Sequence, residues 1–251
     1  MKTILVTGSS SGIGRSTALL FVQSGWNVVS WGRRLEKMEA WKNKLSKTDQ
    51  NRVFLQRVDI RFENQVKDAF QSLPKKFKTI DLLLNNAGLA LGKSPIQNGL
   101  IDDWEQMIDT NLKGLLYVTK IISIEMVERK SGQIINIGSV AGKETYPDGN
   151  VYNATKFAVD GLTSAMRQDL CRHGIRVSQI CPGMVETEFS NIRFNGDDTK
   201  AKEVYKNMKP LDPDDVADLI NYVANTPLHV NIADILILPS QQASATVISR
   251  N

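Results

Sequence analysis

The chain has 251 residues, of which 41% are hydrophobic, so it is long enough to bury a large core, and one α/β domain is expected rather than two small ones. Its 31 Lys and Arg residues and 27 Asp and Glu residues leave a formal charge of +4. Because these charges are dispersed along the chain, they do not indicate a nucleic-acid surface. The 2 cysteines are too few for a disulfide framework, and no Cys/His cluster has metal-ligand spacing, so we expect buried free thiols and no metal.

No segment of the sequence approaches the run of apolar residues that crosses a membrane. The short apolar run after Lys2 is too brief for the core of a signal peptide. We therefore expect a protein of the reducing cytoplasm, with neither a membrane nor a nucleic acid as its partner.

Short β-rich apolar runs alternate with longer helical patterns in chain order. The runs that predict strands are 3–7, 27–31, 53–58, 80–85, 133–137, 176–180 and 234–238. The patterns that predict helices are 14–24, 35–46, 103–130 and 150–173, and a glycine follows three of them closely. Seven strands separated by amphipathic segments predict an α/β fold, in which helices cover both faces of a doubly wound parallel sheet.

No linker, repeat or low-complexity run divides the chain, so residues 1–251 are interpreted as a single domain. A polar segment at 195–198 marks an excursion within that domain, at about 184–210. The tail, residues 239–251, lacks helical periodicity, so it is expected to pack on a neighbouring subunit or to be disordered.

A glycine-rich turn joins the first predicted strand to the first predicted helix. Gly8, Gly12 and Gly14 allow backbone amides to approach a pyrophosphate at the positive end of the helix dipole. Their spacing differs from G-x-G-x-x-G, and glycines also serve tight packing in such turns. The hydroxyls between them could bond phosphate or cap the helix, and they belong to Ser9, Ser10 and Ser11.

Two arginines follow the second predicted strand. A dinucleotide fold commonly has an acid there to bind the adenosine ribose, but this chain has Arg33 and Arg34. Guanidinium groups suit a 2′-phosphate, so the pair favours NADP over NAD. A solvated arginine pair at a strand end is the alternative.

Tyr152 and Lys156 are four residues apart, so they share one face of the helix predicted at 150–173. A nearby ammonium can lower the pKa of a phenol from its ordinary value of about 10 and make it a proton-transfer group near neutral pH. The spacing alone also fits a solvated helix face with an aromatic ring at its edge. The helix follows the fifth strand, however, and ligands of open α/β sheets bind beyond the carboxyl ends of the strands.

Several short motifs occur in order along the whole chain. They are Thr7-Gly-x-x-x-Gly-Ile-Gly14, Asn85-Asn-Ala-Gly88, Asn111, Ser139, Tyr152-x-x-x-Lys156 and Pro182-Gly183. Together they resemble the short-chain dehydrogenase/reductase family, which implies a Rossmann-type sheet and hydride transfer. The resemblance makes Tyr152 the general acid or base, with Lys156 lowering its pKa and holding the nicotinamide ribose. It makes Ser139 a donor to the substrate oxygen and Asn111 part of a water relay, although a buried structural amide is the alternative for Asn111.

The same resemblance implies an NADP site that runs from the glycine turn to the segment that begins at Pro182. Its residues are Gly8, Ser9, Ser10, Ser11, Gly12, Ile13, Gly14, Arg33, Arg34, Asp59, Ile60, Asn86, Ala87, Gly88, Tyr152, Lys156, Pro182, Gly183, Val185 and Thr187. Asp59 would accept a hydrogen bond from the adenine amino group, or would instead cap the helix that follows it.

A narrower resemblance is to the NADP-dependent 3-hydroxy acid dehydrogenases, also described as serine or allo-threonine dehydrogenases. It rests on the stretches 85–92, 103–111, 188–194 and 196–198. It implies exchange of a hydride between NADP(H) and the 3-hydroxyl or 3-oxo group of a small acid, such as serine, allo-threonine, 3-hydroxyisobutyrate or 3-hydroxypropionate. The excursion would then cover the substrate, with Arg193 as the first candidate for its carboxylate and Lys143 as the second. A surface charge is the alternative for each.

Other functions remain open from the sequence. One is a broad NADPH-dependent carbonyl reductase that acts on uncharged ketones or aldehydes, and another is a non-catalytic dinucleotide-binding protein. A methyltransferase also uses a glycine turn, but it needs neither the Tyr152 and Lys156 pair nor the basic residues after strand two. The family resemblance further implies a homotetramer formed through the long helices.

Overall fold

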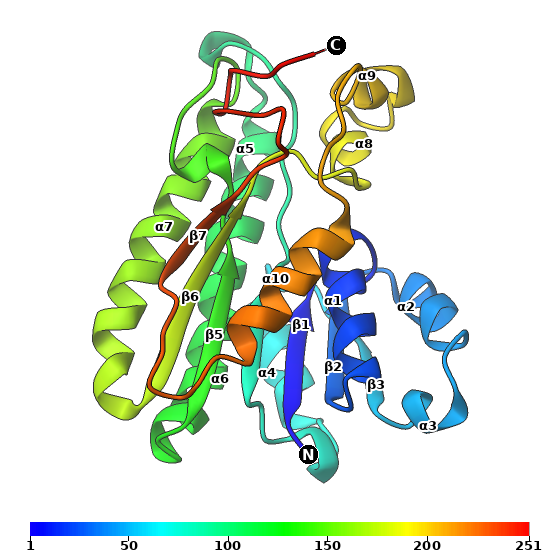
Figure 1. The fold of residues 1–251 in the computed structure, drawn as a ribbon, viewed down its shortest axis with the longest axis vertical. Coiled ribbons are helices and arrows are strands. Elements are labelled where there is room, and N and C mark those ends of the chain that lie inside the picture. The colour runs from blue at the N-terminus through cyan, green and yellow to red at the C-terminus, as the bar shows by residue number, and fades with distance from the viewer. Residues whose placement is uncertain (251) are drawn as a thin grey trace.

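The computed structural model describes residues 1–250, and within them seven parallel strands form one sheet (Figure 1). The strand order is β3-β2-β1-β4-β5-β6-β7. Their bounds are β1 Thr3–Thr7, β2 Asn27–Gly32, β3 Val53–Arg57, β4 Leu82–Asn85, β5 Gly132–Ile137, β6 Ile175–Pro182 and β7 Asp234–Ile237. The order reverses between β1 and β4, and this is the point at which a doubly wound sheet opens a crevice for ligands. The predicted fold is confirmed.

The central strands are buried on both faces, which explains why they appear as unbroken apolar runs in the sequence. In β1, Ile4 and Val6 pack into one core while Leu5 packs into the other. All three side chains are fully buried, so neither face of this strand contacts water. Such runs carry a clear signal, and each predicted strand agrees with an observed one within two residues at either end.

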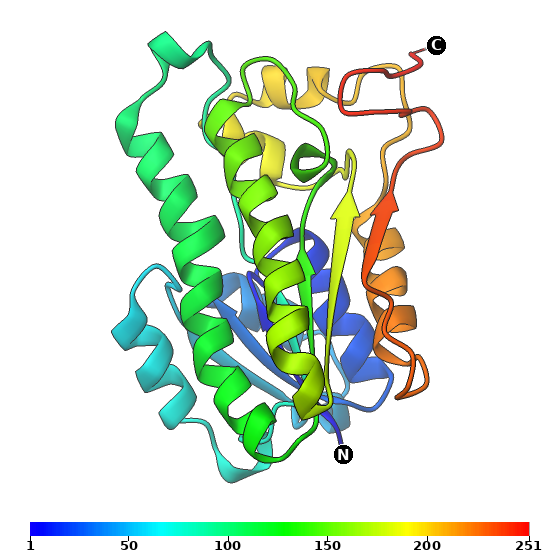
Figure 2. The same cartoon turned by 90° about the vertical axis from the view of Figure 1, so that its left-hand side faces the viewer.

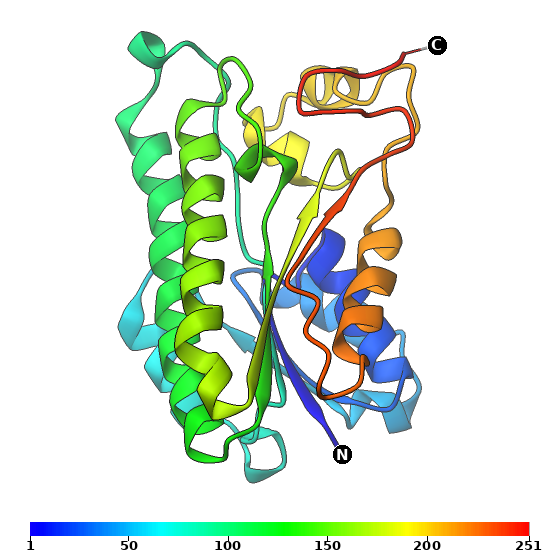
Figure 3. The same ribbon diagram turned by 60° about the vertical axis from the view of Figure 1, so that its left-hand side comes forward.

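Helices cover the two faces of the sheet (Figures 2 and 3). One core contains residues of α1 (Gly12–Gln23), α2 (Leu35–Lys42) and α10 (Pro213–Ala224). The other contains residues of α4 (Glu63–Gln71) and α6 (Leu115–Glu128), with side chains of α7 (Asn150–Leu170) packed against it. Figure 2 shows α6 and α7 lying side by side along the sheet. The remaining helical segments are α3 Lys47–Gln50, η1 Lys75–Phe77, η2 Ile96–Asn98, α5 Ile101–Ile108, η3 Asp109–Gly114, η4 Val140–Gly142, η5 Cys171–His173, α8 Phe189–Arg193 and α9 Asp198–Glu203.

Two predicted helices differ from the structure. The helix predicted at 103–130 contains a π-helical segment, η3, between α5 and α6. At its end Gly114 lies against Ile60, where a Cβ would be only 2.6 Å from the Ile60 Cδ1 atom, so a larger residue there would displace the Ile60 side chain. The helix predicted at 35–46 ends earlier, at Lys42.

The excursion after β6 contains the short helices α8 and α9, and it lies at the carboxyl end of the sheet (Figure 1). The tail folds back beside it. The Gln242 side chain accepts a hydrogen bond from the Met184 amide at 2.8 Å, and Arg250 donates one to the Val204 carbonyl at 3.0 Å. The prediction of a disordered tail is therefore wrong for residues 239–250, which pack on their own chain.

Within residues 1–250, no helix is long and apolar enough to cross a membrane, and no group of three His, Cys, Asp or Glu side chains is arranged to hold a metal. Cys181 is buried as predicted, but Cys171 is exposed at the end of α7, so the prediction of a second buried thiol is wrong.

Candidate active site

A cavity of about 540 Å³ lies at the carboxyl ends of the strands. Every predicted cofactor-binding residue lines it except Ser9 and Gly14. The predicted catalytic residues Ser139, Tyr152 and Lys156 line it as well. The fold thus brings residues from across the whole chain to one crevice.

The glycine turn forms one wall of the cavity, and its shape depends on close backbone contacts. Gly8 and Gly12 have φ angles of +69° and +52°, a region that side chains with a Cβ rarely adopt. A Cβ on Gly14 would lie 2.5 Å from both the Gly8 carbonyl oxygen and the Asn86 side-chain nitrogen Nδ2. Glycine at this position therefore allows the turn to pack this closely. The Thr7 hydroxyl accepts hydrogen bonds from the amides of residues 86 and 87, both at 3.0 Å, and so joins this turn to the end of β4.

The serines of the turn separate into two environments. Ser10 and Ser11 line the cavity, and their hydroxyls accept hydrogen bonds from Arg34 at 3.0 and 2.9 Å. Ser9 is fully buried behind the turn, where its hydroxyl donates to the Trp31 carbonyl at 3.3 Å. No side chain of the turn caps α1. Two hydroxyls therefore remain available to a phosphate, whereas Ser9 shapes the turn.

Two ion pairs lie at the end of the cavity that Arg33 and Arg34 line, which we call the outer end. Arg34 lies 2.7 Å from one carboxylate oxygen of Glu188, and Lys37 lies 2.5 Å from the other. Burial acts to raise the pKa of Glu188, but the hydrogen bonds from Lys37 and Arg34 outweigh it and the pKa is lowered. Glu188 and Lys37 were not predicted as site residues, because no local pattern reveals a contact between residues 151 positions apart.

Arg33 is exposed at the same end and lines the cavity with Asp59. Asp59 accepts hydrogen bonds from the guanidinium of Arg61, one of them at 2.6 Å. Burial acts to raise the pKa of Asp59, but Arg61 and the more distant charge of Arg33 lower it. Helix α4 has Phe62 at its N-cap position, so the alternative of Asp59 as the cap of this helix is wrong.

Tyr152 and Lys156 lie near the start of α7 and point into the inner end of the cavity, as their spacing predicted. Both side chains are buried, with 8% and 7% of their surface exposed. The Lys156 ammonium lies 5.9 Å from the Tyr152 ring centroid and donates a hydrogen bond to the Ile137 carbonyl at 2.9 Å. Ser139 follows β5 at the start of η4, where its hydroxyl accepts a hydrogen bond from the Ala141 amide at 3.1 Å.

The protein's own groups do not lower the pKa of Tyr152, and its lowering by Lys156 beside a cationic cofactor stays a prediction. Burial raises the pKa of Tyr152 above its ordinary value, and hydrogen bonding with Ser139 and the charge of Arg193 only partly oppose this. Burial also lowers the pKa of Lys156 to about 8. Desolvation disfavours both charged forms, so it outweighs the attraction that the sequence suggested.

Asn111 lies in the π-helical segment η3 and is buried just behind the cavity wall. Its side chain accepts a hydrogen bond from the Leu89 amide at 2.9 Å and donates to the Thr155 hydroxyl at 3.1 Å. A Cβ on Gly88 would lie 3.2 Å from its carbonyl oxygen and 3.7 Å from the Lys156 ammonium nitrogen. Asn111 is therefore close to Lys156, and its part in a water relay stays a prediction.

Arg193, on α8, reaches the inner end of the cavity. Its Nη1 donates to the Tyr146 hydroxyl at 2.9 Å and its Nε to the Gly92 carbonyl at 3.2 Å. The guanidinium carbon lies 5.8 Å from the Tyr152 ring centroid. Within residues 1–250, the buried Nη2 of Arg193 has no hydrogen-bond partner. A cation with an unused donor thus lies beside the buried phenol, and Tyr146 holds it there.

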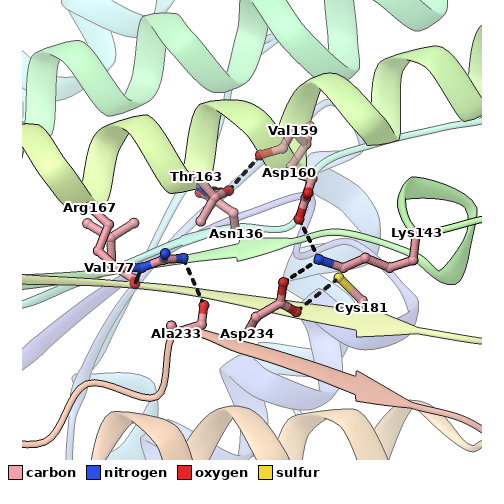
Figure 4. Close-up of polar contacts among 10 residues, drawn as sticks. All are labelled: Asn136, Lys143, Val159, Asp160, Thr163, Arg167, Val177, Cys181, Ala233 and Asp234. Atoms are coloured by element: carbon pink, nitrogen blue, oxygen red, sulfur yellow. Dashed lines mark hydrogen bonds and ion pairs between the residues drawn. The ribbon is translucent and has the colours of Figure 1, made fainter.

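Lys143 lies outside the residues that line the cavity. Its ammonium forms ion pairs with Asp160, at 2.5 Å, and with Asp234 (Figure 4). Burial acts to lower the pKa of Lys143, but these two carboxylates raise it. Two carboxylates already hold the ammonium, so the structure disagrees with the hypothesis that Lys143 binds the substrate carboxylate.

The end of β6 and the segment that follows it border the cavity and contact the glycine turn. Pro182, Gly183, Val185 and Thr187 all line it. A Cβ on Gly12 would lie only 3.1 Å from the Thr187 methyl carbon, so the start of the excursion rests on the turn. One continuous cavity therefore runs from the arginines to Tyr152.

A sequence model of the short chain dehydrogenase family matches residues 2–197. The chain is 43% identical over 243 residues to an NADP-dependent 3-hydroxy acid dehydrogenase of Escherichia coli K12, covering 96% of both chains. It is 42% identical to serine 3-dehydrogenase of Rhizobium radiobacter, covering 97% of this chain and 96% of that one. It is 40% identical to sulfoacetaldehyde reductase 2 of Chromohalobacter salexigens, covering 99% of this chain and 98% of that one.

Solved structures agree with this likeness. A closed form of serine dehydrogenase complexed with NADP+ superposes with a TM-score of 0.93 at 42% identity, covering 99% of both chains. Serine dehydrogenase from Escherichia coli superposes with a TM-score of 0.83 at 37% identity, covering 96% of this chain and 99% of that one. With the family model spanning most of the sequence and the motif residues gathered at one crevice, the chain belongs to the short chain dehydrogenase family.

Proposed function

We propose that this protein is an NADP-dependent oxidoreductase that transfers a hydride between NADP(H) and the 3-hydroxyl or 3-oxo group of a small acid. The observation that carries the proposal is the buried Nη2 of Arg193 beside Tyr152, which has no hydrogen-bond partner among residues 1–250. A buried donor without a partner is costly, and a substrate carboxylate would supply one. The names of the 3-hydroxy acid and serine dehydrogenases among the relatives support the same class of substrate.

The residues of the cavity fit a dinucleotide. Gly8 and Gly12 line the cavity with positive φ angles at the amino end of α1, where backbone amides and the helix dipole favour a pyrophosphate. Arg33, Arg34 and the hydroxyls of Ser10 and Ser11 surround the outer end and suit a 2′-phosphate, which NAD lacks. When bound, the cofactor supplies or accepts the hydride.

Tyr152 would supply the proton that the carbonyl oxygen takes up during reduction. Because burial raises its pKa, the phenol is protonated at neutral pH and serves as the acid that gives a proton to a carbonyl oxygen during reduction. Ser139 donates a second hydrogen bond to the same oxygen, where negative charge develops. Lys156 would hold the nicotinamide ribose and, when protonated, would stabilise the phenolate that remains.

Arg193 would hold the other end of the substrate. With the carboxylate on the guanidinium and the hydroxyl on the phenol, a substrate must be short, because the guanidinium carbon and the Tyr152 ring centroid are 5.8 Å apart. Residues 184–210 would form the lid over it, since Arg193 lies on α8 within this segment. Lys143 has no part in this binding.

The test is formation of NADPH, followed by its near-ultraviolet absorbance, with L-serine, allo-threonine, 3-hydroxyisobutyrate and simple secondary alcohols, each with NADP and with NAD. Preferential turnover of the hydroxy acids with NADP is expected. Turnover of only the uncharged alcohols would instead indicate a broad carbonyl reductase. Binding of NADPH without any turnover would indicate a non-catalytic dinucleotide-binding protein.

We also propose that the protein is a cytoplasmic homotetramer. Exposed apolar side chains on the long helices support an interface there, namely Ile101, Ile108, Leu116, Ile124 and Phe157. An exposed free thiol at Cys171 suits a reducing compartment. Light scattering after size-exclusion chromatography tests the tetramer, and a monomeric mass would contradict it.

A further inference from the structure

The face of α7 that packs on the sheet carries an unusual number of polar groups. Lys156, Asp160, Thr163 and Arg167 follow one another at intervals of four, three and four residues, so they form one stripe along the helix. Val159 is the one aliphatic side chain among the buried residues of this helix. Packing of α7 on the sheet therefore depends on polar contacts more than a typical amphipathic helix does.

Each member of this stripe bonds to a neighbouring strand or turn: Lys156 donates to the Ile137 carbonyl, and Figure 4 shows the contacts of the other three. Asn136 of β5 donates to the Thr163 hydroxyl at 2.9 Å. Arg167 donates to the Val177 carbonyl of β6 and to the Ala233 carbonyl just before β7, both at 3.1 Å. Apolar contacts allow a helix to slide, whereas hydrogen bonds have preferred distances and angles. The stripe therefore fixes the position of α7 along the sheet.

Lys143 is the junction of this arrangement. It ends the short turn that begins with Ser139, and its ammonium lies between Asp160 of α7 and Asp234 of β7. The buried Cys181 thiol donates to the other oxygen of Asp234 at 3.8 Å. The Lys143 ammonium thus links the Ser139 turn to α7 and to β7, the edge strand of the sheet.

The turn and the helix touch directly at the catalytic residues. A Cβ on Gly142 would lie 2.6 Å from the carbonyl oxygen of Lys156, so the backbone of the turn rests on the helix there. Asp160 lies one helical turn beyond Lys156, and Lys143 directly follows Gly142. The ion pair between Lys143 and Asp160 therefore lies next to this close contact between the Ser139 turn and α7.

We propose that Lys143, with Asp160 and Asp234, is a positioning cluster that holds the Ser139 turn against α7, so that the Ser139 hydroxyl and the Tyr152 phenol meet the same substrate oxygen. This inference rests on the proposed oxidoreductase function. None of the three side chains lines the cavity, so the cluster acts through Ser139 and not on the substrate.

The first variant is Lys143→Met, which keeps the length of the side chain and removes its charge. Small misplacement of catalytic groups is costly, so kcat should fall roughly 10- to 100-fold. NADPH binding, measured by fluorescence titration, should change less than about twofold, because the glycine turn and the arginines are distant in the fold. Lys143→Arg, which keeps the charge, should recover most of the loss. Lys67→Met, which breaks the exposed pair with Glu63 at 3.0 Å, is the matched control.

The pH profile separates positioning from mere stability. The titratable groups around Tyr152 are Lys156 on the same helix, Tyr146, Cys181 of β6 and Arg193 of α8, and Lys143→Met leaves all of them in place. The Ser139 hydrogen bond lowers the pKa of Tyr152, so a displaced Ser139 should move the profile of alcohol oxidation to higher pH. A variant that is only less stable would keep the wild-type profile.

A double-mutant cycle completes the test. Asp160→Asn combined with Lys143→Met should be no slower than Lys143→Met alone, because both changes break the same contact. A wild-type kcat and pH profile in Lys143→Met would overturn the proposal, as would additive losses in the cycle. Turnover by the wild-type protein tests the proposed function, whereas the ratio of variant to wild type, on any alcohol that is turned over, tests the cluster.

Discussion

The two ends of the cavity use charge in opposite ways. At the outer end, Arg34 and Glu188 form an ion pair in which they retain 35% and 41% of their side-chain exposure. At the inner end, Tyr152 and Lys156 are buried, and desolvation favours the neutral form of each. Exposed charges recognise an anion without loss of their ionisation, whereas buried groups can change their protonation during a reaction.

The energies differ accordingly. An exposed ion pair contributes about 0–1 kcal/mol, so the contact between Arg34 and Glu188 can be exchanged for a phosphate at low cost. A buried group whose ionisation is disfavoured responds strongly to each new charge or hydrogen bond. We therefore expect changes at the inner end to have the larger effects.

The largest effect should follow Tyr152→Phe. This change removes the transferable proton and keeps the ring that packs against Phe189, 5.7 Å away between centroids. Turnover should fall roughly 10²- to 10⁴-fold while NADPH binding is retained. Steady-state kinetics and fluorescence titration check the two halves of this expectation, and unchanged turnover would remove Tyr152 from its role.

The pH dependence of alcohol oxidation should be the next largest effect. Oxidation needs the deprotonated phenol, and burial raises the pKa of Tyr152, so the initial rate should rise with pH through the neutral and alkaline range. The rise should be about tenfold per pH unit below the pKa. Reduction needs the protonated phenol and should not show this rise. Initial rates in both directions across pH provide the measurement, and a flat oxidation profile would contradict the assignment.

Arg193→Met should separate charged from uncharged substrates. Loss of the charge-assisted hydrogen bonds should raise the KM for 3-hydroxyisobutyrate roughly 10- to 100-fold and leave an uncharged secondary alcohol almost unaffected. Lys200→Met, in the same excursion but exposed, is the matched control. Equal effects of Arg193→Met on both substrates would end the carboxylate assignment.

The smallest of these effects belongs to the outer end. Arg33→Ala should weaken the binding of NADP about tenfold, because one exposed charge-assisted contact with the 2′-phosphate is lost. Binding of NAD should stay the same, since NAD has no phosphate at that position. Titration of both cofactors measures the ratio, and an unchanged preference would refute the phosphate role of Arg33.

Local patterns explain how much of this molecule could be predicted from its sequence. Buried parallel strands appear as continuous apolar runs, and residues four apart share one helix face, so the sheet and the shared placement of Tyr152 and Lys156 at the cavity were predictable. The contact between Glu188 and Arg34 was not, since it joins two distant loops. Lys143 was misjudged because its position in sequence, just after Ser139, gave no sign that two aspartates from other elements hold it.

The pKa of Tyr152 could not be predicted from helical spacing alone. Helical spacing predicts that Lys156 is near the phenol, but the extent of burial depends on α8 and on the Tyr146 segment, which the spacing does not describe. Desolvation acts on both groups at once, so proximity alone does not give the direction of the shift among the protein's own groups. The protonation state of a buried group can be predicted only when all the residues that pack around it are known.

Recognition of the substrate carboxylate can be measured as the ratio of kcat/KM for 3-hydroxyisobutyrate to kcat/KM for its neutral amide, with NADP, in the wild-type protein and in Arg193→Met. The two substrates have nearly the same size, so the ratio reports recognition of the carboxylate. We expect a ratio of roughly 10 or more that falls toward one in the variant. A ratio near one in the wild-type protein, or a ratio that Arg193→Met leaves unchanged, would contradict it.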